Sequence, residues 1–164
     1  MSASAPLPRI LVADDERINL LALSSALNGE FDVVEAGTGA EVIERAAAGD
    51  IDLILLDVVM PGLDGFQVCR RLKSNPSTAT IPVIFVTGLD DSAEENQGFS
   101  AGAVDYITKP IRAATLRARV RAHVELKRSR DLFEQLVSRD PLTGVANRRR
   151  FDAAIAEERR RCRG

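Results

Sequence analysis

The sequence predicts an α/β fold in which a five-stranded parallel sheet is doubly wound, with helices on both faces. Two observations lead to this prediction. Five short apolar runs rich in Ile, Val and Leu alternate with stretches of helical periodicity over the first 110 residues. The helical stretches are long enough to connect parallel neighbours, and such connections are normally right-handed, so helices should cover both faces of the sheet.

The strands are predicted from apolar runs of four to six residues that are rich in β-branched or aliphatic side chains. Such runs suit a strand that is buried on both faces. In chain order they are "RILVA" (9–13), "FDVVEA" (31–36), "IDLILL" (51–56), "IPVIFV" (81–86) and "VDYI" (104–107).

The helices are predicted from stretches between these runs, each of which ends near Gly, Asn or Pro. In chain order they are "RINLLALSSAL" (17–27), "AEVIERAAA" (40–48), "FQVCRRLK" (66–73) and "EENQGFSAG" (94–102), followed by a long pattern from Arg112 to Ser138.

Length and composition indicate a soluble chain with one core and a short appendage. The 164 residues are 45% hydrophobic and 28% charged, which is typical of a globular protein. No apolar run reaches the length of a membrane span, so no membrane contact is expected. Residues 1–8 are expected to be a disordered lead-in rather than a signal peptide. Cys69 and Cys162 lack metal-ligand spacing, which favours free thiols in the cytoplasm.

The charge is divided along the chain. Residues 1–110 hold 7 basic and 17 acidic residues, whereas residues 111–164 hold 15 basic and 7 acidic ones. A basic end raises the possibility of nucleic-acid binding. However, the arginines recur among helix-forming residues without aromatic or recognition-helix signatures, so a solvated helix face is expected and nucleic acid is not.

Polar residues gather where the predicted strands end. Asp14 and Asp15 follow the first strand, Asp57 the third, Thr87 the fourth and Lys109 the fifth. Each has an ordinary explanation, since an aspartate can cap a helix, a threonine can end a strand and a lysine can be solvated. Ligands bind outside the carboxyl ends of the strands in such sheets, and together these residues indicate a binding site.

This set of residues suits Mg²⁺ and phosphoryl chemistry. Crowded carboxylates repel one another unless a cation offsets their charge. Mg²⁺ prefers hard oxygen ligands and is usually held by one or two carboxylates together with phosphate oxygens. An aspartate in such a site can act as a nucleophile toward phosphorus, and Asp57 is the predicted phosphoacceptor. Lys109 and Thr87 would then meet the phosphoryl oxygens.

Four motifs resemble the receiver domain of bacterial two-component response regulators: "ADDE", "LLDVVMPGLDG", "VTG" and "GAVDYITKP". They occur in the order typical of that family. The resemblance assigns residues 9–125 to a receiver domain of flavodoxin-like fold. It implies phosphorylation of Asp57 by a sensor histidine kinase or phosphotransfer protein.

The resemblance also implies a role for each site residue. Asp15 would contact Mg²⁺ directly, Asp14 mainly through water, and the Val59 backbone carbonyl would be a further ligand, beside Asp57 itself. Lys109 would pair with the phosphoryl group, with a cis peptide bond between Lys109 and Pro110. Thr87 and Tyr106 would form a switch, in which movement of the threonine makes room for the tyrosine.

Two enzyme classes fit the sequence less well. A phosphatase of the haloacid dehalogenase type needs a second acid two residues after its nucleophile, and Val59 stands there. A dinucleotide site in "GTGAEV" (37–42) lacks its third glycine, since Val42 occupies that place, so the start of a helix is expected instead.

The last predicted helix is longer than a receiver domain needs. Residues 126–138 are expected to form a helical linker. Leu116, Val120 and Val124 recur at four-residue spacing, and Leu126, Phe133, Leu136 and Val137 continue an apolar stripe without a strict heptad. A homodimer through this helix is expected, and a single amphipathic helix packed on its own domain is the alternative.

Residues 139–164 resemble the opening of a GGDEF diguanylate cyclase domain. The matching positions are Asp140, Leu142, Thr143, Gly144, Asn147, Arg148 and Arg149. The Gly-Gly-acid-Glu-Phe loop itself does not occur, so this chain is expected to be a cyclase response regulator cut short after its receiver, with no cyclase activity and only self-phosphorylation and self-dephosphorylation of its aspartate. The alternative is a stand-alone receiver that acts as a phosphorylation-dependent interaction module.

Overall fold

The computed structural model describes residues 6–88 and 92–138, and the predicted doubly wound parallel sheet is confirmed. Its five strands lie in the order β2-β1-β3-β4-β5 and are all parallel. They are β1 (Arg9–Ala13), β2 (Asp32–Ala36), β3 (Leu53–Leu56), β4 (Val83–Thr87) and β5 (Asp105–Thr108).

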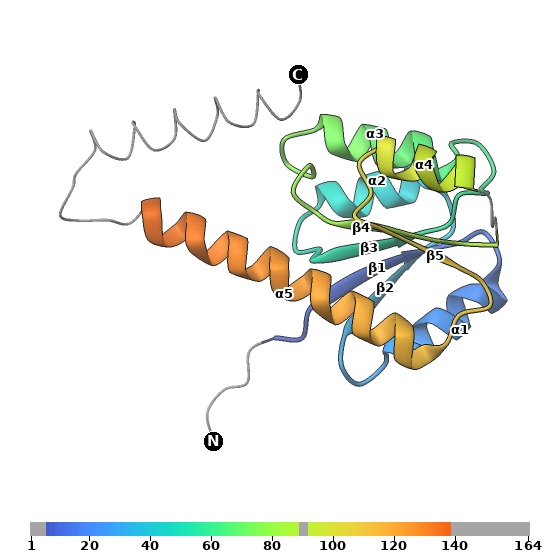
Figure 1. Cartoon of the computed structure of the whole chain (residues 1–164), viewed down its shortest axis with the longest axis horizontal. Helices are drawn as coiled ribbons and strands as arrows, with labels where there is room; N and C mark the ends of the chain where they lie inside the picture. The colour runs from blue at the N-terminus through green and yellow to red at the C-terminus, as the bar shows by residue number, and fades with distance from the viewer. Residues whose placement is uncertain (1–5, 89–91, 139–164) are drawn as a thin grey trace. The chain divides into compact units, whose positions relative to one another are not determined.

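Helices cover both faces of this sheet. Helix α1 and the first part of α5 lie on one face, and α2, α3 and α4 lie on the other (Figure 1). The bounds are α1 (Arg17–Leu27), α2 (Gly39–Ala47), α3 (Gly65–Ser74), α4 (Ser92–Ser100) and α5 (Ala113–Ser138).

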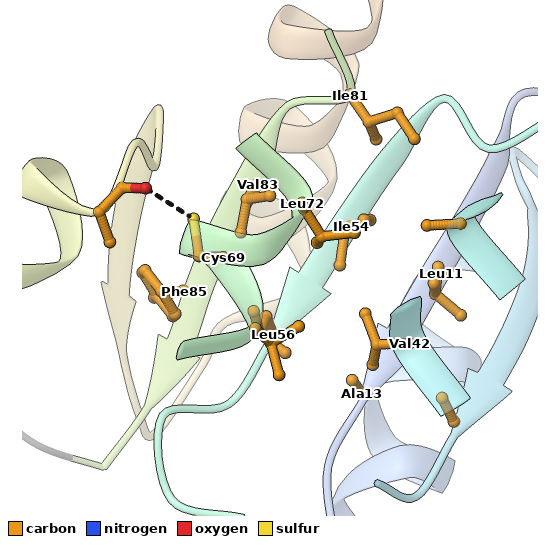
Figure 2. Close-up of a cluster of buried hydrophobic side chains, with 14 of the residues drawn as sticks. Leu11, Ala13, Val42, Ile54, Leu56, Cys69, Leu72, Ile81, Val83 and Phe85 are labelled. Carbon is orange, nitrogen blue, oxygen red and sulfur yellow. Dashed lines mark hydrogen bonds between the residues drawn. The ribbon is translucent and has the colours of Figure 1, made fainter. Parts of the chain in front are cut away.

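The sheet separates two hydrophobic clusters because side chains alternate between its faces. Leu11, Ile54 and Phe85 point to the cluster beneath α2 and α3, which Figure 2 shows. Ile10, Leu53 and Ile84, one residue earlier on each strand, point to the cluster beneath α1 and α5. Strands buried on both faces explain why the sequence shows continuous apolar runs rather than alternation.

Small differences from the predicted boundaries bear on the site. Strand β4 begins at Val83 rather than Ile81, since Pro82 has no N–H to donate to the neighbouring strand. It continues to Thr87, which pairs with Thr108 at the end of β5. The two threonines therefore lie at the sheet edge, and Lys109 follows immediately.

Helix α5 divides the predicted apolar stripe into two parts. Leu116, Val120 and Val124 are buried against the sheet, as their spacing indicates. The compact unit that holds the sheet ends at Lys127. Leu126, Phe133 and Leu136 have 61%, 56% and 64% of their surfaces exposed. The GGDEF-like stretch 139–164 and lead-in residues 1–5 lie outside the described residues.

None of the helices described within residues 6–88 and 92–138 is long and apolar enough to cross a membrane.

Candidate functional site

Asp14, Asp57 and Lys109 meet at the carboxyl edge of the sheet because each directly follows a strand end. Ala13 of β1 pairs with Leu56 of β3, so the next residue of each strand carries a carboxylate at the same height. The backbone holds both in place, since the Asp57 N–H donates to the Ala13 carbonyl at 3.1 Å and the Asp14 N–H donates to the Ala36 carbonyl at 3.2 Å.

Three carboxylates come together at this edge. Ligand oxygens of Asp14, Asp15 and Asp57 all lie within 4.8 Å of one another. Asp14 and Asp57 are buried, with 1% and 7% of their surfaces exposed, whereas Asp15 is exposed. This donor set fits Mg²⁺, which prefers carboxylate oxygens and retains several waters, because two of the acids are fixed and the third faces solvent.

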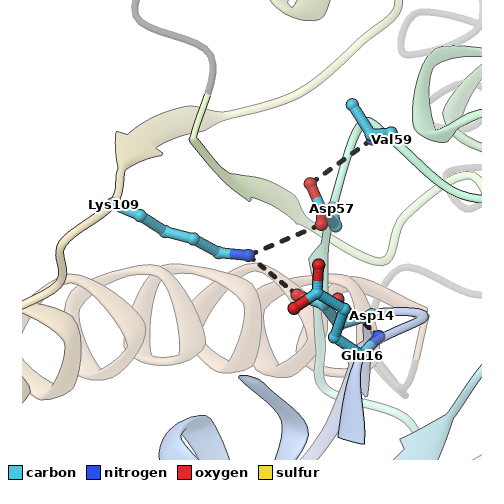
Figure 3. Close-up of polar contacts among 5 residues, drawn as sticks. All are labelled: Asp14, Glu16, Asp57, Val59 and Lys109. Carbon is cyan, nitrogen blue, oxygen red and sulfur yellow. Dashed lines mark hydrogen bonds and ion pairs between the residues drawn. The ribbon is translucent and has the colours of Figure 1, made fainter. Parts of the chain in front are cut away.

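Lys109 supplies the positive charge nearest to these acids (Figure 3). Its Nζ lies 2.8 Å from Asp14 Oδ2 and 3.5 Å from Asp57 Oδ2. The Lys109–Pro110 peptide bond is cis, and the Lys109 N–H donates to the Thr87 carbonyl at 2.8 Å. The side chain of Lys109 is 22% exposed, so its ammonium reaches both the acids and the solvent.

The two buried aspartates are affected differently by this arrangement. Burial alone raises the pKa of Asp14, but hydrogen bonds from Lys109, the Glu16 backbone and Asn19 outweigh burial, so its pKa lies below the ordinary value. Burial raises the pKa of Asp57, and the negative charge of Asp14 adds to this effect while Lys109 opposes it. The site therefore holds one firmly ionised carboxylate and one whose charge is not fully compensated.

Lys109 remains firmly protonated between them. Burial lowers its pKa, but the hydrogen bond to Asp14 and the charges of both aspartates raise it above the ordinary value.

Thr87 and Tyr106 occupy the same edge. Thr87 is buried, with 1% of its surface exposed, and its hydroxyl hydrogen-bonds to the Asp57 carboxylate. Tyr106 is also buried, and its ring lies 6.2 Å from the ring of Phe85, centre to centre. Val59 is 59% exposed, and its N–H donates to Asp57 Oδ1 at 3.4 Å. All the predicted site residues therefore lie on or beside one edge.

The alternatives weighed from the sequence fare less well. Neither Asp14 nor Asp15 is the N-cap of α1, since that residue is Glu16. Instead, Asp14 Oδ1 accepts a hydrogen bond from the Glu16 N–H at 3.0 Å. The "GTGAEV" stretch begins α2, where the Thr38 side chain caps the helix by accepting from the Glu41 N–H at 3.2 Å.

Two contributors were missed in the sequence. Asn19, in the first turn of α1, hydrogen-bonds to Asp14. Its signal was a polar residue among the leucines of that helix, one turn after the acids. Gly65, the first residue of α3, packs against the Asp57 backbone, and an isolated glycine in the sequence gives no indication of such a contact.

Comparisons with known proteins agree with this geometry. The family described as "Response regulator receiver domain" matches residues 10–121. The chain is 46% identical over 120 residues to the response regulator PleD of Caulobacter vibrioides, covering 73% of this chain and 26% of that protein. It is 42% identical over 124 residues to a probable cyclic di-GMP phosphodiesterase of Vibrio cholerae, covering 76% and 28%.

Solved structures show the same similarity. A putative response regulator from Chloroflexus aurantiacus superposes with a TM-score of 0.70 and 31% identity, covering 73% of this chain and 98% of that one. By contrast, the chain spans only about a quarter of the length of the two curated relatives.

Proposed function

The chain belongs to the response regulator receiver domain family, and from this premise we propose that it accepts a phosphoryl group on Asp57 in a site that uses Mg²⁺. The observation that carries the proposal is the convergence of three carboxylates within 4.8 Å, with the Lys109 ammonium beside two of them. Family members receive the phosphoryl group from a histidine kinase or a phosphotransfer protein, and we propose such a donor here.

Asp57 is proposed as the nucleophile. A carboxylate oxygen attacks the phosphorus, the bond between phosphorus and the donor imidazole nitrogen breaks, and the bonding electrons leave with the imidazole. Asp57 suits this role because its charge is the less compensated of the two buried aspartates. Asp14, held by Lys109, Glu16 and Asn19, remains ionised and available as a metal ligand.

The remaining polar groups would stabilise the transferred group. A bound Mg²⁺ would supply charge that offsets the carboxylates and the phosphoryl oxygens. Asp15 would contact the metal directly, Asp14 mainly through water, with the Val59 carbonyl as a backbone ligand. Lys109 would turn part of its interaction from Asp14 to the phosphoryl group, a short movement because its Nζ already lies 3.5 Å from Asp57.

The proposed switch uses Thr87 and Tyr106. The Thr87 hydroxyl already hydrogen-bonds to Asp57, and a phosphoryl oxygen would take over as its acceptor. Tyr106 is buried beside Phe85 on the neighbouring strand, where a change at Thr87 would be felt. A two-state response of this kind needs packings that differ by only a few kcal/mol.

The donor would approach from the side of α1. Ile18 and Leu21 on this helix are 72% and 54% exposed, and α1 begins two residues after Asp15. Exposed apolar residues next to the acids suit a protein partner. We place this transfer in the cytoplasm, where the buried thiol of Cys69 stays reduced.

The output is proposed to be a diguanylate cyclase, with a homodimer formed through α5. Support comes from the GGDEF-like residues after Ser138, from the cyclic di-GMP relative, and from the exposed apolar residues Leu126, Phe133 and Leu136. A stand-alone receiver that signals by binding another protein is the second candidate, favoured by the exposed apolar face of α1.

Binding of the phosphoryl mimic beryllofluoride tests the phosphoacceptor site. With Mg²⁺, ¹⁹F NMR of the 164-residue chain should show bound fluoride signals that vanish in Asp57→Ala. Asp32→Asn is a matched control, because Asp32 is an exposed acid paired with Arg9. Bound signals that persist in Asp57→Ala would refute the assignment.

A further inference from the structure

The start of α3 lies directly against the phosphoacceptor strand end. Gly65 is buried, and its N–H donates to the Val58 carbonyl at 2.8 Å. A β-carbon added at Gly65 would overlap the Asp57 carbonyl oxygen. It would also lie 2.8 Å from Val58 Cα and 3.0 Å from the Asp57 carbonyl carbon. These atoms belong to the backbone that carries the reactive carboxylate.

Space, rather than backbone conformation, requires the glycine. The dihedral angles of Gly65 do not fall in the left-handed region, so an alanine could adopt them. The crowding involves main-chain atoms only, which cannot swing aside as a flexible side chain can. One of the two segments would have to move to admit a methyl group.

The loop would move rather than the helix, because α3 is firmly fixed. Asp64 and Gln67 form a capping box at its start, with bonds of 2.9 and 3.0 Å. The apolar face of α3 is buried in the sheet cluster through Phe66, Val68, Cys69 and Leu72. The loop after Asp57 is less enclosed, as the 59% exposure of Val59 shows.

From this geometry we infer that Gly65 is a positioning residue for phosphoryl transfer: its missing side chain lets the segment Asp57–Val59 sit where the carboxylate faces Asp14 and Lys109. The inference rests on the proposed function. Reaction rates are sensitive to displacements of about 1 Å, which can cost on the order of 100-fold. A methyl group at position 65 should therefore slow phosphorylation far more than it destabilises the fold.

Gly39 offers a matched control. It is the first residue of α2, is buried like Gly65, and an added β-carbon would lie 2.6 Å from Val68 Cγ2 and 3.1 Å from two atoms of Leu63. Neither of those residues belongs to the site. Gly39→Ala thus introduces the same methyl group at the same place in a helix, without touching Asp57.

The experiment compares wild type, Gly65→Ala and Gly39→Ala as full 164-residue chains. Phosphorylation by acetyl phosphate with Mg²⁺ should fall roughly 10-fold to 100-fold in Gly65→Ala and less than about 3-fold in Gly39→Ala. Thermal unfolding midpoints are measured alongside. In the metal-free protein, amide NMR shifts of residues 57–59 should change in Gly65→Ala and not in Gly39→Ala, a readout independent of activity.

Each outcome decides the matter. Equal rates and equal amide shifts in the two variants would overturn the role of Gly65. Failure of Gly65→Ala to fold, even in the cold with a stabilising osmolyte, would also overturn it, because the glycine would then serve the fold as a whole. A wild-type chain that takes up no phosphoryl group would instead refute the proposed function, so the two failures are distinguishable.

Discussion

The ammonium of Lys109 lies 2.8 Å from Oδ2 of Asp14, a carboxylate with only 1% of its side chain exposed. This pair connects the end of β5 to the end of β1, and Asp14 depends on it for compensation of its charge. Removal of one partner from such a pair leaves a buried charge without its main counter-charge, which is costly.

Lys109→Met should therefore destabilise the metal-free chain by about 2 kcal/mol, the range for hydrogen bonds to charged groups. Added Mg²⁺ should restore more stability to this variant than to wild type, because the cation replaces the lost ammonium. Thermal unfolding in EDTA and in Mg²⁺ measures both effects. Arg121→Met is the control, since its exposed ion pair with Glu30 should contribute under about 1 kcal/mol. Equal Mg²⁺ effects in all three chains would argue against a shared site.

Asp57 has the opposite relation to stability. Its pKa is raised in the folded protein, so the folded state loses stability as the pH rises from the ordinary aspartate value through the raised one. At neutral pH the penalty is fully present. Asp57→Asn should stabilise the metal-free chain there, by roughly 0.5 to 2 kcal/mol, and the gain should disappear in acid.

Urea unfolding in EDTA at several pH values measures this difference. Asp32→Asn, a change at an exposed acid paired with Arg9, should bring no such gain. An Asp57→Asn chain that is less stable than wild type at neutral pH would contradict the idea that the carboxylates are crowded.

Asp105 illustrates a carboxylate that stabilises the fold. Burial raises its pKa, but Arg119 at 2.7 Å, the Tyr106 N–H at 2.8 Å and His123 at 3.3 Å outweigh burial, so its pKa is lowered. A lowered pKa gives stability that is present above the unfolded value and lost as the pH falls through the folded one. Asp105→Asn should cost about 1 kcal/mol at pH 7.

Unfolding measured from neutral to acid pH checks this expectation. The cost should shrink below about pH 4, where the unfolded aspartate becomes protonated. A cost that stays constant with pH would mean that packing, rather than charge, explains the effect of the substitution.

The sequence allowed the fold and most of the site to be predicted, for reasons visible in particular residues. Asp14, Asp57 and Lys109 each follow an apolar run, and in a parallel sheet all such positions lie at one edge. That Lys109 lies closer to Asp14 than to Asp57 depends on side-chain geometry, which the order of residues does not encode.

Contacts between elements were the harder part. The contact between Gly65 and the Asp57 backbone depends on how α3 packs against the sheet, and a lone glycine does not announce it. Likewise, the apolar stripe of α5 gave no indication that Val124 would be buried and Leu126 exposed, because helical periodicity alone does not show where the domain surface ends.

The exposed residues of α5 lead to a prediction about assembly. In sedimentation velocity with Mg²⁺ and beryllofluoride, the chain should shift from monomer toward dimer, and Phe133→Glu with Leu136→Glu should reduce the shift at least 10-fold in dissociation constant, since two buried apolar side chains contribute on the order of 1.5 to 3 kcal/mol each. Ile18→Glu, an equally exposed apolar position on α1, is the control. Dimers that are insensitive to both α5 substitutions would place the interface elsewhere.

The most direct test of the central claim is the intact mass of the chain after incubation with acetyl phosphate. The account predicts a gain of one phosphoryl group that requires Mg²⁺, is removed by hydroxylamine as expected for an acyl phosphate, and is absent in Asp57→Ala. A phosphoryl group that Asp57→Ala still acquires, or a wild-type chain that acquires none while Mg²⁺ is bound, would contradict the assignment of Asp57 as the phosphoacceptor.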